Sequence, residues 1–305
     1  MTYGRLDGVD KRISRLVMGT TIDLDQPSVC ELYDDFFRNG GNCFDTAHVY
    51  CRGRTERRLG EWISSRNVRA NVVLVVKGAH PPHCNPKMLV KQFEESLSRL
   101  HTDYADIYFL HRDNTDIPVS EFVDALAGLK ARGMLRSYGG SNWTPDRFDE
   151  ANAYAQSKGL MPFVAVSNNF SLARMVTPVW TGCLSSSGPA FLKWHIDRQV
   201  PCFAWSSQAR GFFFKALSAR QDHEDEELAR CWYSEDNFRR LLRCKELALK
   251  KDVQASTIAL AYVLCQPFPA WAIIGPSSPE RCMPSYAALK IRLTDDEMKW
   301  LNLEQ

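Results

Sequence analysis

The sequence predicts an α/β protein of the (β/α)8 class, the TIM barrel, with an N-terminal hairpin and extra helices at its C-terminal end. Two observations lead to this prediction. Short apolar runs alternate with segments of helical period eight times, which is typical of repeated βα units. The chain has 305 residues, and barrels of this kind reach that size undivided. No linker or low-complexity tract interrupts the alternation, so we expect residues 1–305 to form a single domain.

The first elements are a hairpin, a strand and an amphipathic helix. Residues 1–15 alternate short polar and apolar side chains around two glycines, which indicates a small hairpin that closes the barrel floor. The apolar run 16–18 then leads to Gly19, where the first barrel strand ends. Apolar side chains recur near helical spacing over 29–39, and Gly40 marks the end of that helix.

The same alternation predicts the remaining elements. Residues 72–76 form an apolar run rich in β-branched side chains, as expected of a buried strand. Leu89, Phe93 and Leu97 are spaced four apart, so they share one face of a helix. The barrel strands are expected at 16–18, 43–45, 72–76, 106–110, 137–140, 163–166, 201–206 and 271–274. The helices are expected at 29–39, 55–64, 86–100, 119–132, 145–158 and 188–198, from 256 and after 279, with extra helices at 235–250 and following 294–297.

One stretch breaks this rhythm. Between Ser206 and Asp236 lie about thirty residues, and a loop of that length in a compact domain is usually functional or mobile. It contains an acidic run at 221–227, which we interpret as a solvated helix face.

Composition narrows the class of function. Charged residues make up 24% and hydrophobic ones 45%, an ordinary globular balance, and the net charge of +2 gives no reason to expect a nucleic-acid partner. No apolar run approaches the roughly 20 residues of a membrane span, and the first residues do not start a signal peptide. The 10 cysteines include no Cys-x-x-Cys pair, so we expect reduced thiols and a cytoplasmic protein. The oligomeric state stays open.

Ionisable side chains follow three neighbouring strands. Asp45 ends the second strand and Tyr50 lies in the loop just after it; Lys77 and His111 end the third and fourth strands. The carboxyl ends of barrel strands meet at one face, so these four groups can converge there. Taken singly, each has a structural interpretation: a helix cap for the aspartate, a solvated lysine, or a hydrogen-bonded core histidine.

The combination resembles the aldo-keto reductase superfamily. The motif Asp45-x4-Tyr50, the lysine after a β-branched run and the Leu110-His111 pair carry the resemblance, which extends over nearly the whole chain. It implies hydride transfer to a carbonyl group, with Asp45, Tyr50, Lys77 and His111 as the catalytic residues. Tyr50 is then the proton donor, its pKa lowered by Lys77, which Asp45 holds in an ion pair. His111 orients the substrate oxygen. Relatives that reduce carbon–carbon double bonds have glutamate in its place.

The resemblance also implies NADPH or NADP+ as the cofactor, although the sequence has no Gly-x-Gly-x-x-Gly fingerprint. In this family an extended dinucleotide crosses the barrel mouth, and the loop after Ser206 covers its pyrophosphate. Two positions depart from the family pattern: Ser167 replaces a glutamine that binds the carboxamide, and Pro284-Ser285 replaces the Glu-Asn pair that contacts adenine. The expected cofactor-binding residues are Gly19, Thr20, Thr21, Asp45, Ser141, Asn142, Asn168, Trp205, Ser206, Gln208, Arg210, Gly275, Ser277 and Arg281.

The loops after the strands indicate a polar substrate. They carry charged and hydrogen-bonding side chains, which an apolar ligand would leave unpaired. We therefore expect a small-molecule carbonyl compound such as a sugar or a sugar-derived aldehyde, and a place in carbohydrate metabolism. The alternative is that these side chains simply face solvent. The candidate substrate-binding residues are His48, Arg52, His111, Arg112 and Trp143.

Two other interpretations bear on the class of protein. His80, His83 and Cys84 lie close together in sequence but do not make up four metal ligands, so no metal site is predicted. A regulatory subunit that binds the cofactor with little turnover, like the channel β-subunits of the superfamily, has the same four catalytic positions. Turnover of carbonyl compounds with NADPH separates that alternative from an oxidoreductase.

Overall fold

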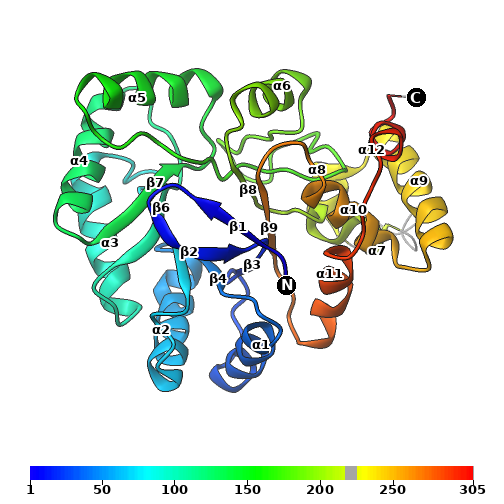
Figure 1. Cartoon of the computed structure of the whole chain (residues 1–305), viewed down its shortest axis with the longest axis horizontal. Helices are drawn as coiled ribbons and strands as arrows, with labels where there is room; N and C mark the ends of the chain where they lie inside the picture. Colours follow the sequence, from blue (N-terminus) through cyan, green and yellow to red (C-terminus); the bar gives the residue numbers. More distant parts are fainter. Residues whose placement is uncertain (217–224, 305) are drawn as a thin grey trace.

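The computed structural model describes residues 1–216 and 225–304. Its main sheet has seven parallel strands in the order β7-β6-β5-β4-β3-β9-β8, and the sheet curls with helices around it (Figure 1). The strands are β3 (Leu16–Gly19), β4 (Cys43–Ala47), β5 (Val73–Gly78), β6 (Ala105–Leu110), β7 (Leu135–Gly140), β8 (Cys202–Ala204) and β9 (Ala270–Ile274).

The segment 163–168 joins the two ends of this sheet. Val166 forms parallel bridges to Gly140 of β7 on one side and Cys202 of β8 on the other. Its amide donates to Pro201 O (3.0 Å) and its carbonyl accepts from Phe203 N (2.8 Å). The strand expected at 163–166 is therefore reduced to isolated bridges, but it occupies the eighth position and closes the (β/α)8 barrel.

An antiparallel hairpin covers one end of the barrel, as expected. It consists of β1 (Tyr3–Leu6) and β2 (Val9–Ser14), drawn in dark blue in Figure 1. Leu6, Val9 and Ile13 of the hairpin are buried against apolar side chains that fill the barrel interior. The hairpin thus removes the floor of the barrel from water, and the opposite end, where the strands have their carboxyl ends, stays open for a site.

Helices surround the sheet and bury their apolar faces on it. Several begin at a side-chain cap: Asp25, Asn85, Thr144, Ser234 and Thr294 each accept a hydrogen bond from a backbone amide of the first turn. The helices are α1 (Gln26–Arg38), α2 (Arg54–Arg66), α3 (Pro86–Arg99), α4 (Val119–Ala131), α5 (Pro145–Ser157), α6 (Pro189–Arg198), α7 (Phe212–Lys215), α8 (Glu226–Trp232), α9 (Glu235–Lys251), α10 (Ala255–Leu264), α11 (Met283–Ala288) and α12 (Asp295–Leu301).

The long stretch after Ser206 contains short helices. The 3-10 turn η2 (Ala209–Gly211), α7 and α8 lie in it. Of the acidic run expected to form a solvated helix face, residues 221–224 lie outside the described residues. Asp225 caps α8 and pairs with Lys215 (2.6 Å), and Glu227 pairs with Arg210 (2.7 Å).

Searched over residues 1–216 and 225–304, the structure contains no helix long and apolar enough to cross a bilayer.

Candidate active site

A cavity of about 990 Å³ lies at the carboxyl ends of the barrel strands. Parallel strands in a closed barrel all end at one face, so side chains far apart in sequence meet there. The residues predicted for the site that line this cavity are Gly19, Thr21, Asp45, Tyr50, Lys77, His111, Arg112, Ser141, Asn142, Trp205, Ser206, Gln208, Arg210, Gly275, Ser277 and Arg281.

A buried ion pair forms the deep wall of the cavity. Asp45 on β4 and Lys77 on β5 are 2% and 1% exposed, and Lys77 Nζ lies 2.5 Å and 2.7 Å from the two carboxylate oxygens of Asp45. The two strands pair in parallel, with Ala47 opposite Lys77, which brings both side chains to one edge of the sheet. Burial raises the pKa of Asp45, and the lysine opposes that rise. Each charge is therefore committed largely to the other.

Tyr50 begins the 3-10 turn η1 (Tyr50–Gly53) that follows β4, and it faces His111. The two ring centroids are 5.7 Å apart in an edge-to-face arrangement. Burial raises the pKa of the Tyr50 hydroxyl well above its usual value, and the nearby Asp45 carboxylate raises it further. The cation that lowers this pKa is Arg112. The expectation that Lys77 lowers this pKa stays a prediction; here Lys77 is paired with Asp45.

His111, at the end of β6, is held in the neutral form. Burial lowers the pKa of its imidazole well below the usual value, and the positive charges of Lys77 and Arg112 lower it further. Its ring packs edge-to-face on His80, with 5.1 Å between centroids. Within the part of the chain that the structure describes, His111 Nδ1 has no hydrogen-bond partner although it is buried. A neutral imidazole therefore offers a ligand one donor and one acceptor nitrogen.

Ser141 and Asn142 follow β7 and lie on the adjoining wall of the cavity. The Ser141 hydroxyl donates to Ser167 O (2.6 Å), and the Asn142 amide donates to His111 O (3.3 Å) and to Ser141 Oγ (3.1 Å). Asn142 Oδ1 accepts from Leu184 N (3.0 Å). Both oxygens keep a free lone pair for a donor in the cavity.

The turns after β9 line another end of the cavity. Gly275, Ser277 and Arg281 come from the turns after β9, and Pro284 and Ser285 line the same end. No ion pair of Arg281 occurs within residues 1–216 and 225–304, and Arg210 is paired with Glu227. A Cβ on Gly275 would meet no atom within 4 Å, so the backbone here is open to a ligand.

Five predicted site residues do not line the cavity. Thr20 is buried beside it, and Asn168 lies behind Asn142, accepting from Asn142 N (2.6 Å) and donating to Trp143 O (3.1 Å). Trp143 is 0% exposed and packs in the core against Phe163 and Gly140. His48 bonds to Glu95 (2.7 Å), and Arg52 is exposed outside the cavity. These five residues lie outside the lining of the cavity, and their predicted roles stay untested.

Other lining residues escaped the sequence analysis. Trp180 and Cys183 come from the irregular segment between 169 and 187, and Phe213 and Phe214 come from α7. Trp180 is 51% exposed, and its ring centroid lies 6.4 Å from that of Trp205. Neither segment has the apolar spacing of a helix or a strand. Only their length and their aromatic residues could indicate from the sequence that they line the site.

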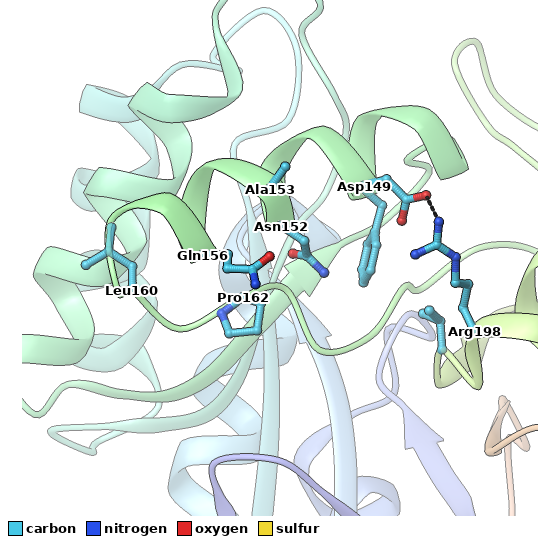
Figure 2. A pocket seen from close by; sticks show the side chains of 10 residues that line it. Asp149, Asn152, Ala153, Gln156, Leu160, Pro162 and Arg198 are labelled. Carbon is cyan, nitrogen blue, oxygen red and sulfur yellow. Dashed lines mark hydrogen bonds and ion pairs between the residues drawn. The ribbon is translucent and has the colours of Figure 1, made fainter.

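A second hollow, of about 800 Å³, lies on the outside of the barrel by α5 and the end of α6 (Figure 2). Asp149 and Arg198 pair across it (3.3 Å). The side chain of Asn152 hydrogen-bonds the backbone of Phe163. Its Oδ1 accepts from the Phe163 amide (2.7 Å), and its Nδ2 donates to the Phe163 carbonyl (3.0 Å). The polar side chains of this hollow are therefore engaged in contacts within the protein, and they do not form a catalytic arrangement. Across the described ranges, no group of three or more His, Cys, Asp or Glu side chains could hold a metal ion.

Comparison with known proteins places these features in a family. A profile of the Aldo/keto reductase family matches residues 15–302. Norsolorinic acid reductase A of Aspergillus parasiticus is 26% identical over 94% of this chain and 76% of that protein. Aryl-alcohol dehydrogenase [NADP(+)] of Phanerodontia chrysosporium is 26% identical over 93% of this chain and 77% of that protein.

A solved structure shares the fold. The crystal structure of the thermostable aldo-keto reductase Tm1743, in complex with the inhibitor epalrestat, superimposes with a TM-score of 0.79 at 24% identity, covering 100% of both chains. Because the family profile covers nearly all of the sequence, the chain belongs to the aldo/keto reductase family and is an oxidoreductase.

Proposed function

We propose that this protein reduces an aldehyde or ketone to an alcohol with NADPH, and that Tyr50 is the proton donor. The observation that supports this most strongly is the arrangement at the base of the cavity. A protonated phenol faces a neutral imidazole next to the buried Asp45–Lys77 pair. Hydride addition to a carbonyl leaves negative charge on oxygen, and such a charge needs a proton donor within hydrogen-bond reach.

In this mechanism the Tyr50 hydroxyl donates its proton to the carbonyl oxygen. Neutral His111 donates a hydrogen bond to the same oxygen, which stabilises the developing charge and fixes the orientation of the carbonyl group. Arg112 stabilises the tyrosinate that remains, in keeping with its effect on the pKa of Tyr50. A proton from solvent then restores the phenol.

The donors and acceptors around the cavity fit a nicotinamide dinucleotide. Ser141 and Asn142 have free acceptor lone pairs suited to the N–H groups of a carboxamide, and Trp205 offers a ring for stacking. Ser206, Gln208, Ser277 and Arg281 line the part suited to phosphates. When bound, this cofactor supplies the hydride.

A preference for NADPH rests on Arg281. A guanidinium without a carboxylate partner among residues 1–216 and 225–304 suits the 2′-phosphate that NADH lacks. The aryl-alcohol dehydrogenase similar to this chain carries NADP(+) in its name, which supports the same choice.

For the substrate we retain a polar carbonyl compound, such as one derived from a sugar, and hence a role in carbohydrate metabolism. Support now comes from Arg112, Trp180 and Trp205, which line the cavity. All 10 cysteines are free, which fits the reducing cytoplasm we propose as its location.

A substrate panel tests the proposal. Oxidation of NADPH, followed by its absorbance, should occur with sugar-derived and with simple aryl aldehydes, with higher kcat/KM for the former. Absence of turnover with every compound, with NADPH and with NADH, would contradict the proposal and favour the regulatory subunit.

A further inference from the structure

Arg112 is a buried cation beside the reacting groups. It directly follows His111, its side chain lines the cavity, and the residue is only 6% exposed. Its Nη1 lies 2.8 Å from His111 O, which places the guanidinium beside His111, and its charge lowers the pKa of both Tyr50 and His111. A guanidinium in such a position needs compensation, since a buried charge without a counter-charge is costly.

Among residues 1–216 and 225–304, the hydrogen-bond partners of the Arg112 guanidinium are neutral. Arg112 Nη1 donates to His111 O (2.8 Å), and Nη2 donates to Cys183 Sγ (3.2 Å). No carboxylate within the described ranges forms an ion pair with it. The adjacent Asp113 is turned away and bonds Arg147 through both oxygens (2.9 and 3.2 Å). Asp113 is therefore already committed to another guanidinium.

The neighbouring loop packs beside this guanidinium. Gly182 has φ +76°, and a Cβ there would stand 3.7 Å from Arg112 Nε. A guanidinium has five N–H donors, and the two bonds above leave three of them without a partner in the described part of the chain. The donor fork matches the two oxygens of a carboxylate.

We propose that Arg112 binds a carboxylate carried by the carbonyl substrate itself. This inference rests on the proposed function and narrows its substrate class to aldehydes or ketones with an anionic group near the reacting carbon. A charge-assisted contact to a desolvated guanidinium contributes enough to change kcat/KM by about tenfold or more.

The test compares charged and neutral substrates of one shape. The 2-, 3- and 4-carboxybenzaldehydes move the carboxylate stepwise away from the carbonyl group, and the methyl ester of each removes the charge. With NADPH, at least one acid should exceed its ester about tenfold in kcat/KM. Arg112→Met should bring that ratio close to one, and Arg112→Lys, which keeps the charge, should retain part of it. Arg239→Met, on the exposed face of α9, should leave the ratio unchanged.

The outcomes separate the two proposals. Esters turned over as well as all three acids would overturn the carboxylate inference and leave the reductase intact. Turnover of neither acids nor esters would overturn both. The anion bound by Arg112 could also be a phosphate of the cofactor. Fluorescence titration of Arg112→Met with NADPH tests this, because it measures the dissociation constant of NADPH. A loss of NADPH affinity as large as the loss of the acid preference would assign Arg112 to the cofactor phosphates instead.

Discussion

Among single residues, burial decides the protonation states on which the proposed chemistry depends. Tyr50 and His111 both sit where the charged form is disfavoured, so the phenol keeps its proton and the imidazole stays neutral near pH 7. The Asp45–Lys77 pair remains beside them as a fixed dipole. Asp45 adds to the rise in the pKa of Tyr50, and Arg112, expected from the sequence only as a substrate-binding residue, opposes that rise.

Arg281 provides the residue-level prediction on cofactor choice. Its removal takes away the cation that we assign to the 2′-phosphate. Arg281→Ala should weaken NADPH binding about tenfold and leave NADH binding nearly unchanged. Fluorescence titration with both dinucleotides measures this, with exposed Lys290→Ala as the control variant. Equal affinity of the unmodified protein for NADPH and NADH would contradict the assignment.

Among the elements, the turn η1 positions Tyr50. Cys51, Arg52 and Gly53 have φ angles of 46°, 56° and 81°, so the chain makes a left-handed turn before α2 begins. Such angles cost about 1 kcal/mol for each residue other than glycine, so surrounding contacts must hold them.

The last residue of α3 holds this turn. Arg99 Nη1 donates to His48 O (3.2 Å) and pairs with the fully buried Glu56 (2.9 Å). A Cβ on Gly53 would lie 2.6 Å from the same Nη1, so the turn packs directly on the guanidinium. Arg99 thus connects α3 to the loop that carries the proposed proton donor.

Arg99→Met tests this positioning role. The variant leaves Glu56 buried without its cation, which should lower the free energy of unfolding by on the order of 3 kcal/mol. It should also lower kcat about tenfold or more with little change in NADPH affinity, because the donor is displaced and the cofactor residues are not. Arg132→Met, which removes an exposed pair with Glu94, is the control. Arg99→Met with the kcat of the unmodified enzyme would contradict the role.

The sequence could predict most elements because their signals are local. Apolar periodicity and caps located the helices, and the strand ends located Asp45, Tyr50, Lys77 and His111 in one cavity. The sequence predicted a full strand at 163–166, and the structure reduces it to isolated bridges at Val166. The close approach of Ala165 O to Gly139, 2.0 Å from the Cβ position, is a tertiary contact that local signals do not carry. Trp143, expected to bind substrate, is fully buried, and its ring packs on Gly140.

For the molecule as a whole, stability should depend on pH through His195, which lies in the layer outside the sheet. It is 0% exposed, its Nδ1 donates to Val200 O (2.8 Å), and its ring stacks on Phe268 at 4.6 Å. Burial lowers the pKa of His195 to about 4. Above pH 6.5 the His195 imidazole is neutral in both the folded and the unfolded protein. Between pH 6.5 and 4 only the unfolded chain takes up the proton, so stability falls as the pH falls.

Urea unfolding at pH 7 and pH 5 measures this loss. His195 should account for about 2 kcal/mol of the decrease in the free energy of unfolding between pH 7 and pH 5. In His195→Gln the decrease between these pH values should be smaller by that amount, whatever the stability of the variant at pH 7. Exposed His101→Gln should not alter the decrease. A loss in His195→Gln equal to that of the unmodified protein would show that His195 does not titrate as its burial implies.

Tyr50→Phe tests the central claim most directly. Within the described residues the Tyr50 hydroxyl donates no hydrogen bond to the protein, so its removal should leave the fold intact. Reduction of the best aldehyde of the panel with NADPH should fall by a factor of about 10² to 10⁴, while the NADPH dissociation constant stays within about twofold. Tyr154→Phe, on the surface of α5, should behave like the unmodified enzyme. Turnover by Tyr50→Phe close to that of the unmodified enzyme would contradict Tyr50 as the proton donor.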